Sequence, residues 1–186
     1  MWAFLDHINA ILVGSVVAVI SLSVLIAGQG ESVGTTSRAA AVGALATTVE
    51  WVERDLTNVG AGVPTGDPVV VDASWSGLTP SVTFVTGADT SVTAAPQTVR
   101  YERVSTGGGA FELRRYEVGP AGDRLTARSP PTLRSAEVHV RSHDGSEVAD
   151  PSEARTVEVR LSMAPPSGAR GPVEWARRFV IRTPSE

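Results

Sequence analysis

The first segment of the chain is a long run of apolar and small residues without charge. The twenty residues from Ile8 to Ala27 carry no charged side chain, and the uncharged stretch continues until Glu31. A helix of that length is about 30 Å long, which matches the hydrocarbon core of a bilayer. A cleavable signal peptide is the alternative, but Met1–His7 has no basic residue and the run exceeds the usual length of about 7–15 residues. We therefore expect a retained transmembrane helix over residues 1–30.

Small and acidic residues in this segment mark a candidate helix–helix assembly site. Ala10, Gly14 and Ala18 form a row spaced four residues apart, and small residues let helix backbones approach closely in lipid. Gly and Ala are also common in membrane helices that make no such contact. Asp6 precedes the apolar run, where it is either a solvated residue at the membrane surface or a partner for the amine of a neighbouring chain.

The distribution of positive charge bears on the orientation of this segment. The nearest basic residue after the apolar run is Arg38. Because short cytoplasmic flanks of membrane helices are rich in Lys and Arg, we expect the large body that follows to lie outside the cytoplasm, in the periplasm or at the cell surface.

A second helical pattern follows a glycine-containing joint. Gln29–Thr36 holds two glycines, and each costs a helix about 1 kcal/mol relative to alanine, so we expect a flexible or melted joint. A helix is predicted from Thr36 to Asn58, because an apolar stripe recurs there every three or four residues: Val42, Leu45, Val49, Val52, Leu56 and Val59. Polar residues occupy the other faces: Thr48, Glu50, Glu53, Arg54 and Asn58. We expect the apolar stripe to pack on a sheet.

Beyond Pro64 the pattern changes to a period of two, broken by turn residues. In Thr156–Met163, for example, apolar and polar residues alternate strictly, which is typical of an antiparallel strand with one covered face. Gly107–Gly109 and Asp144–Gly145 are turn signals between strands. The predicted strands are Val69–Asp72, Ser81–Thr86, Thr98–Val104, Phe111–Val118, Ser135–Ser142, Thr156–Met163 and Trp175–Arg182.

The predicted fold class is therefore α+β, with a long N-terminal helix whose second half packs on an antiparallel sheet. We divide the chain into a transmembrane helix (1–30), a joint with an amphipathic helix (31–63) and a β-rich extracytoplasmic domain (64–186).

Composition removes several function classes. The chain has no cysteine, so it has no disulfide, thiolate metal site or thiol nucleophile. All 16 basic residues are arginine, which excludes a P-loop lysine and Schiff-base chemistry. The net charge of −4 argues against a nucleic-acid-binding protein.

Few residues suggest chemistry. His139 and His143 share a predicted strand face with Glu137, but residues four apart on a strand lie about 13 Å apart, so we expect a solvated polar face and no metal site. Three aspartates near strand ends lack the spacing of a calcium-binding loop and are interpreted as turn residues: Asp67, Asp72 and Asp89.

Other motifs are interpreted structurally. Ala73–Gly77 departs from a nucleophile elbow because it lacks the first glycine, so we interpret it as a turn. Trp75 within it is a candidate partner contact, with filling of the core as the alternative. Arg114–Arg115 and Arg177–Arg178 are interpreted as charges that protect sheet edges.

Several stretches together resemble the minor pilin W and pseudopilin J group of the type IV pilin-like proteins. Val49–Gly60 is similar to the end of the long helix in that group. Thr98–Tyr101, Leu113–Arg115, Asp144–Gly145 and Val157–Leu161 then follow in the order that the group shows. The resemblance covers most of the chain, although each stretch is short.

The resemblance implies a structural subunit or tip component of a pilus or secretion pseudopilus, with no catalysis and no cofactor. Its implied partners are membrane lipid and other pilin-like subunits or copies of itself. Prepilins carry a basic leader and a glutamate near the start of the mature chain; no glycine precedes Phe4 here, and Asp6 is the candidate for the role of that glutamate. The alternative is a membrane-tethered extracytoplasmic binding module that is not built into a filament.

Overall fold

The structure of the chain, a computed structural model, combines a long α-helix with an antiparallel sheet, and its described residues also include a short 3-10 helix, η1 (Pro151–Glu153). Side chains of the first helix are described from Gly14 onward. The backbone is described for these residues: 2–64, 67, 69–72, 75, 80–87, 96–148, 150–165 and 171–182. The predicted α+β class is confirmed.

The helix α1 spans Trp2–Thr57 without a break, so it is 56 residues and about 84 Å long. The melted joint expected at Gln29–Thr36 is therefore wrong. The segment contains no proline that would remove a backbone bond, and interrupting a helix requires a second, costly nucleation. The hydroxyls of Thr35 and Thr36 donate to the carbonyls of Glu31 and Ser32, at 2.8 and 2.9 Å.

Eight strands follow in the part of the chain that the structure describes, and all seven predicted strands are among them, with ends that differ by up to three residues. Their bounds are β1 (Val70–Asp72), β2 (Ser81–Gly87), β3 (Pro96–Gly107), β4 (Ala110–Gly119), β5 (Gly122–Arg128), β6 (Leu133–Arg141), β7 (Thr156–Met163) and β8 (Val173–Val180).

The strand that the sequence analysis missed is β5. It forms a hairpin with β4, and its seven residues include a single large apolar side chain, Leu125, which is 41% exposed. A strand without a covered face lacks the alternation that identified the others. The Gly119–Gly122 pair that closes this hairpin is the signal that could have revealed it.

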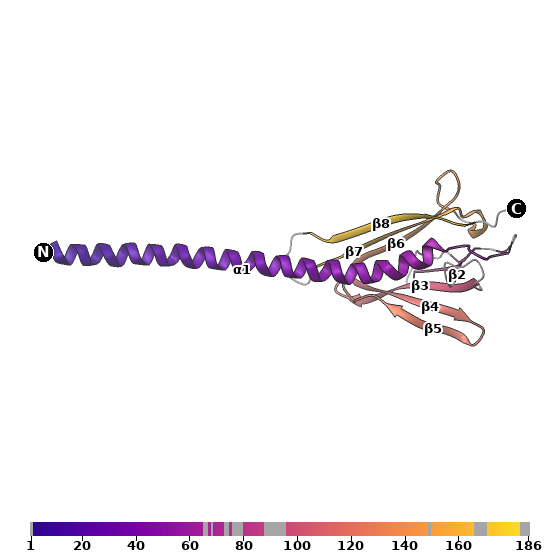
Figure 1. Ribbon diagram of the computed structural model, residues 1–186, viewed down its shortest axis with the longest axis horizontal. Helices are drawn as coiled ribbons and strands as arrows, with labels where there is room; N and C mark the ends of the chain where they lie inside the picture. The colour runs from indigo at the N-terminus through magenta and orange to yellow at the C-terminus, as the bar shows by residue number, and fades with distance from the viewer. Residues whose placement is uncertain are drawn as a thin grey trace.

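The sheet has the order β1-β2-β3-β4-β6-β7-β8, and β5 pairs with β4 outside this path. All pairs are antiparallel, and β4 and β6 meet only at Phe111 and Leu133. Two groups of strands therefore diverge from that point, β1 to β5 and β6 to β8. In Figure 1 the second half of α1 runs between these groups, and the first half projects from them as a rod.

The C-terminal half of α1 closes the core between the two groups, in contact with β2, β7 and β8. Four residues of the predicted stripe are buried, and Val49 is partly buried against them. The assignment of Val42 to the packing stripe is wrong, because its side chain is 47% exposed and Ala41 takes the inward position. The buried members of the stripe are Leu45, Val52, Leu56 and Val59.

Two polar residues assigned to outer faces of the helix are also buried. Thr48 is 1% and Asn58 3% exposed. The Thr48 hydroxyl donates to the Ala44 carbonyl and the Asn58 amide to the Arg54 carbonyl, each at 3.2 Å. The Thr48 hydroxyl is thereby satisfied on the helix backbone, so its burial costs little. For Asn58 this holds only for the amide nitrogen, because its Oδ1 is buried with no hydrogen-bond partner among the described residues.

The chain leaves α1 through Gly60, whose φ of +80° suits glycine. The Gly60 N–H donates to the Val85 carbonyl at 2.8 Å, and the Arg182 N–H donates to the Val59 carbonyl at 3.0 Å. A Cβ on Gly60 would lie 2.2 Å from the Arg182 carbonyl oxygen. The end of the helix is thus held between β2 and the C-terminal segment.

Candidate functional site

The N-terminal half of α1 is a bare apolar rod. From Gly14 to Val33 every described side chain is exposed, and the helix is long and apolar enough to cross a membrane, with none of its most apolar stretch buried. Gly14 has open space where a Cβ would lie, and Ala18 is exposed. No described residue covers this part of the candidate assembly site; the side chains of Asp6 and Ala10 lie outside the described residues.

The buried half of α1 is tied to the sheet by the Asp55 cluster, which consists of Asp55, Tyr101 and Arg115. Arg115 donates from Nε to Asp55 Oδ2 at 2.6 Å and from Nη2 to Oδ1 at 3.2 Å, and the Tyr101 hydroxyl donates to Oδ2 at 2.5 Å. The three residues are only 3–5% exposed. A paired arginine–carboxylate bond of this kind fixes distance and angle together.

Charge and burial in the Asp55 cluster shift the proton affinities of its members. Burial, and then the neighbouring Asp55 carboxylate, raise the pKa of Tyr101 well above its usual value. Burial alone would lower the pKa of Arg115, but the hydrogen bonds and charge of Asp55 raise it overall. The cluster therefore keeps a neutral phenol donor and a charged guanidinium on one carboxylate.

Arg115 was expected to protect a sheet edge, and this interpretation is wrong. It continues the Asp55 cluster toward β5, since its Nη1 lies 2.5 Å from the Thr126 hydroxyl and 3.2 Å from Glu117 Oε1. Arg124 also bonds Glu117 and is the main cause that lowers the pKa of Glu117 to about 2. The strand β5, which the sequence analysis did not predict, thus contributes Thr126 and Arg124 to the contacts around the buried Arg115.

The sheet face turned away from α1 carries a second cluster of charge, centred on Glu158 in β7. Glu158 Oε1 accepts from Arg160 at 2.7 Å, and Oε2 accepts from Arg178 at 3.1 Å. These bonds, Arg160 first, lower the pKa of Glu158 to about 2. Arg178 therefore binds across the β7–β8 pair. Its neighbour Arg177 donates to Glu53 of α1 at 2.6 Å, so this pair does more than protect an edge.

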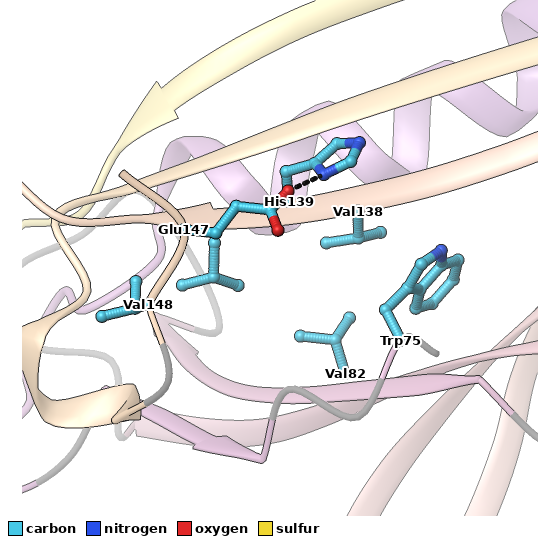
Figure 2. A pocket seen from close by; sticks show the side chains of 7 residues that line it. Trp75, Val82, Val138, His139, Glu147 and Val148 are labelled. Carbon is cyan, nitrogen blue, oxygen red and sulfur yellow. Dashed lines mark hydrogen bonds and ion pairs between the residues drawn. The ribbon is translucent and has the colours of Figure 1, made fainter. Parts of the chain in front are cut away.

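A hollow of about 240 Å³ lies beside β6, and we name it the β6 slot. Figure 2 shows Trp75 and Val148 at its two ends and Val82 across from Val138. His139 and Glu147 form its polar rim, with His139 Nδ1 at 2.8 Å from Glu147 Oε1.

Trp75, the candidate partner contact, forms one wall of this slot. It is half-buried, its Nε1 donates to the Ala136 carbonyl at 3.1 Å, and Arg103 lies over its ring at 5.8 Å. Trp75 is therefore packed partly against the core and also lines the slot. The rest of Ala73–Gly77 lies outside the described residues.

The histidines and carboxylates that the sequence analysis considered as metal ligands do not form a common site among the described residues. Among the described residues no three His, Asp or Glu side chains could hold a metal ion. His139 is bound by Glu147, and Asp89 lies outside the described part of the chain. Asp144 accepts from Ser142 and Ser146, which lower its pKa to about 2, as expected for an aspartate that stabilises a turn.

Comparison with family models, curated proteins and solved structures finds no match for this chain.

Proposed function

We propose that this protein is a structural, non-enzymatic, pilin-like subunit, a minor pilin or pseudopilin of a type IV pilus or secretion-type filament. It assembles through its N-terminal helix with other pilin-like subunits or copies of itself. The observation that carries the proposal is the division of one continuous helix into a bare apolar half and a half embedded in an antiparallel sheet.

The bare half supplies the assembly surface. An apolar helix that is left bare by the described part of the chain needs lipid or other helices around it. Before assembly, the protein is held as a single-pass membrane protein with its β domain outside the cytoplasm. In a filament, neighbouring helices replace the lipid, and the small residues Gly14 and Ala18 allow them to approach closely.

The embedded half supplies a rigid connection to the surface of the filament. Because α1 has no break and its end is fixed by the Asp55 cluster, the β domain follows any rotation or shift of the rod. A subunit whose outer domain must keep a fixed position relative to a helical core requires this stiffness. A simple tether would work equally well with a flexible linker.

The second candidate function is a membrane-tethered extracytoplasmic binding module. The β6 slot favours it, because a hollow with an aromatic wall and a polar rim suits ligand binding. In that case the bare helix remains in lipid and makes no specific contact.

Bulky substitutions on the small-residue face separate the two candidates. Gly14→Leu and Ala18→Leu should reduce filament incorporation by at least about tenfold, because leucine keeps neighbouring backbones apart. Ala27→Leu is the matched control: it adds the same bulk on the opposite side of the helix, nine residues from Ala18, and should assemble normally. Negative-stain microscopy of membranes and sheared surface fractions, with an antibody to the β domain, measures incorporation. Label confined to membranes for the unchanged protein would overturn the filament proposal and support the tethered module.

A further inference from the structure

The strand β6 has one edge that is only partly paired. Its other edge pairs with β7 from Leu133 to Arg141. Toward β4, pairing stops after Phe111 and Leu133 because the two groups of strands diverge there. Alternate residues of a strand direct their N–H and C=O groups to the same edge, so Ala136, Val138 and Val140 face this open side.

Two of these three residues have partners at the open edge. The Ala136 carbonyl accepts from Trp75 Nε1 at 3.1 Å and from Arg103 Nη1 at 3.2 Å. The Val140 carbonyl accepts from the Val148 N–H at 3.1 Å. Within the described part of the chain, no group bonds the N–H or C=O of Val138 on this side. A donor and an acceptor therefore stay available in the middle of the edge.

The available pair lies at the β6 slot. Val82, Val138, Val140 and Val148 line the slot with aliphatic groups, and Trp75 and Val148 stand at its ends (Figure 2). The distance along β6 from Ala136 to Val140 is about 13 Å. An extended segment of about three residues fits between these ends, with its middle side chain directed toward Val82.

The rim of the slot is acidic. His139 lies between two carboxylates, at 2.8 Å from Glu147 and 3.5 Å from Glu137, and these are 67% and 45% exposed. Glu147 lines the slot, and Glu137 lies just outside its lining. One guanidinium, that of Arg103, lies at the Trp75 end, where it donates to the Ala136 carbonyl at 3.2 Å. The two carboxylates together outweigh this single positive charge. Arg160 lies opposite Glu137 across the β6–β7 pair, but its guanidinium bonds Glu158 instead.

We propose that the β6 slot binds an extended peptide segment in which one aliphatic residue lies between two basic residues. The backbone of the aliphatic residue exchanges two hydrogen bonds with Val138, and its side chain enters the slot beside Val82. The flanking basic side chains, which point to the opposite face of the added strand, lie beside Glu147 and Glu137. This is recognition by strand addition, with backbone bonds supplying affinity and the pocket and rim supplying specificity.

The test uses the full chain in detergent micelles and a fluorescently labelled peptide, Thr-Arg-Val-Arg-Thr, blocked at both ends. Saturable binding in fluorescence anisotropy is expected, together with slower hydrogen exchange of the Val138 amide. The same peptide with an N-methyl group on its valine cannot donate to the Val138 carbonyl and should bind at least about tenfold more weakly.

Protein variants test the acidic rim separately. Glu147→Gln should weaken binding about two- to fivefold at low salt, as expected for an exposed charge pair. Glu153→Gln, which removes an exposed carboxylate outside the slot, should leave binding unchanged. Equal binding of the N-methylated and unmodified peptides would overturn the proposal. It would equally be overturned by occupation of the slot by a second copy of the chain, seen as a dimer that the peptide does not dissociate.

Discussion

The two halves of α1 are both rich in apolar side chains, but their polar groups are satisfied in opposite ways. In the bare half, polar side chains bond the helix itself: Ser23 donates to the Val19 carbonyl and Thr35 to the Glu31 carbonyl, each at 2.8 Å. In the buried half, Asp55 bonds Arg115 and Tyr101 from two strands of the sheet. The hydroxyls of the first half therefore need no partner outside the helix, whereas Asp55 in the second half is matched to partners in one sheet.

This difference shows what each half can tolerate. A rotation or one-turn shift of α1 against the sheet would separate Asp55 from Arg115 and leave the buried guanidinium with Glu117 as its remaining carboxylate, at a cost of several kcal/mol. Asp55 also lies in the last turn of α1, where the helix dipole disfavours a negative charge unless it is paired. Lipid or neighbouring helices around the bare half impose no comparable register.

The largest expected effect is the loss of the Asp55 carboxylate. Asp55→Ala leaves the Arg115 guanidinium buried without its main partner and should reduce the free energy of unfolding by about 3–5 kcal/mol. Urea denaturation followed by tryptophan fluorescence measures it, and Trp51, which stacks on Tyr101 at 5.4 Å, contributes to this signal together with the other three tryptophans. A double variant, Asp55→Leu with Arg115→Met, should recover most of the loss, since an apolar pair of similar size replaces a buried ion pair well. A loss below about 1 kcal/mol in the single variant would contradict the role given to the cluster.

The next prediction compares a leucine in the buried half of α1 with a leucine in the bare half. Leu56 is 1% exposed and Leu25 58% exposed. Leu56→Ala opens a cavity in the core and should cost about 2–5 kcal/mol in urea denaturation. Leu25→Ala should change the stability of the β domain by less than about 0.5 kcal/mol. Similar losses in both variants would mean that the bare half packs on the domain after all.

Most of the fold could be predicted because periodicity records which side of an element is covered. The alternation in Thr156–Met163 and the spacing of Leu45, Val52 and Leu56 follow directly from burial on one side. The same logic explains the failures. The strand β5 has no covered face, so it shows no alternation. Val42 fits the three- or four-residue spacing of the stripe as well as Ala41 does, so spacing alone could not choose between them.

The polar parts of the molecule could not be predicted, because pairing depends on neighbours that are distant in sequence. Arg115 lies 60 residues from Asp55, and the sequence around either residue does not predict a buried ion pair. The β6 slot depends on the divergence of β4 and β6, which is a property of the sheet topology. Of the residues that line the slot, Trp75 was singled out as a partner contact, since a large side chain among turn residues is unusual, and His139 was named only as part of a solvated polar face.

A third prediction concerns Glu158, an arginine-bound carboxylate on the sheet face turned away from α1. Arg160 and Arg178 lower the pKa of Glu158 from 4.5 to about 2 in the folded state. The resulting stabilisation is present above pH 4.5 and is lost as the pH falls toward 2. The urea midpoint should therefore fall from pH 7 to pH 3, and by a smaller amount in Glu158→Gln. An identical fall in both proteins would show that Glu158 does not contribute to the acid sensitivity.

The smallest expected effect comes from substitutions at two adjacent residues, Ala41 and Val42. Comparing them tests how α1 is rotated about its axis at the start of its buried half. Val42 is 47% and Ala41 3% exposed, although the apolar stripe read from the sequence includes Val42. Val42→Gln should change the free energy of unfolding by less than about 0.5 kcal/mol, because its side chain already lies in solvent. Ala41→Gln forces a longer polar side chain against the core and should cost about 1–3 kcal/mol. The reverse ranking in urea denaturation would place Val42 inward and would mean that α1 is rotated by about one residue, or 100°, from the position seen here. Since such a rotation would also carry Asp55 away from Arg115, the two measurements check the same arrangement from opposite ends of the buried half.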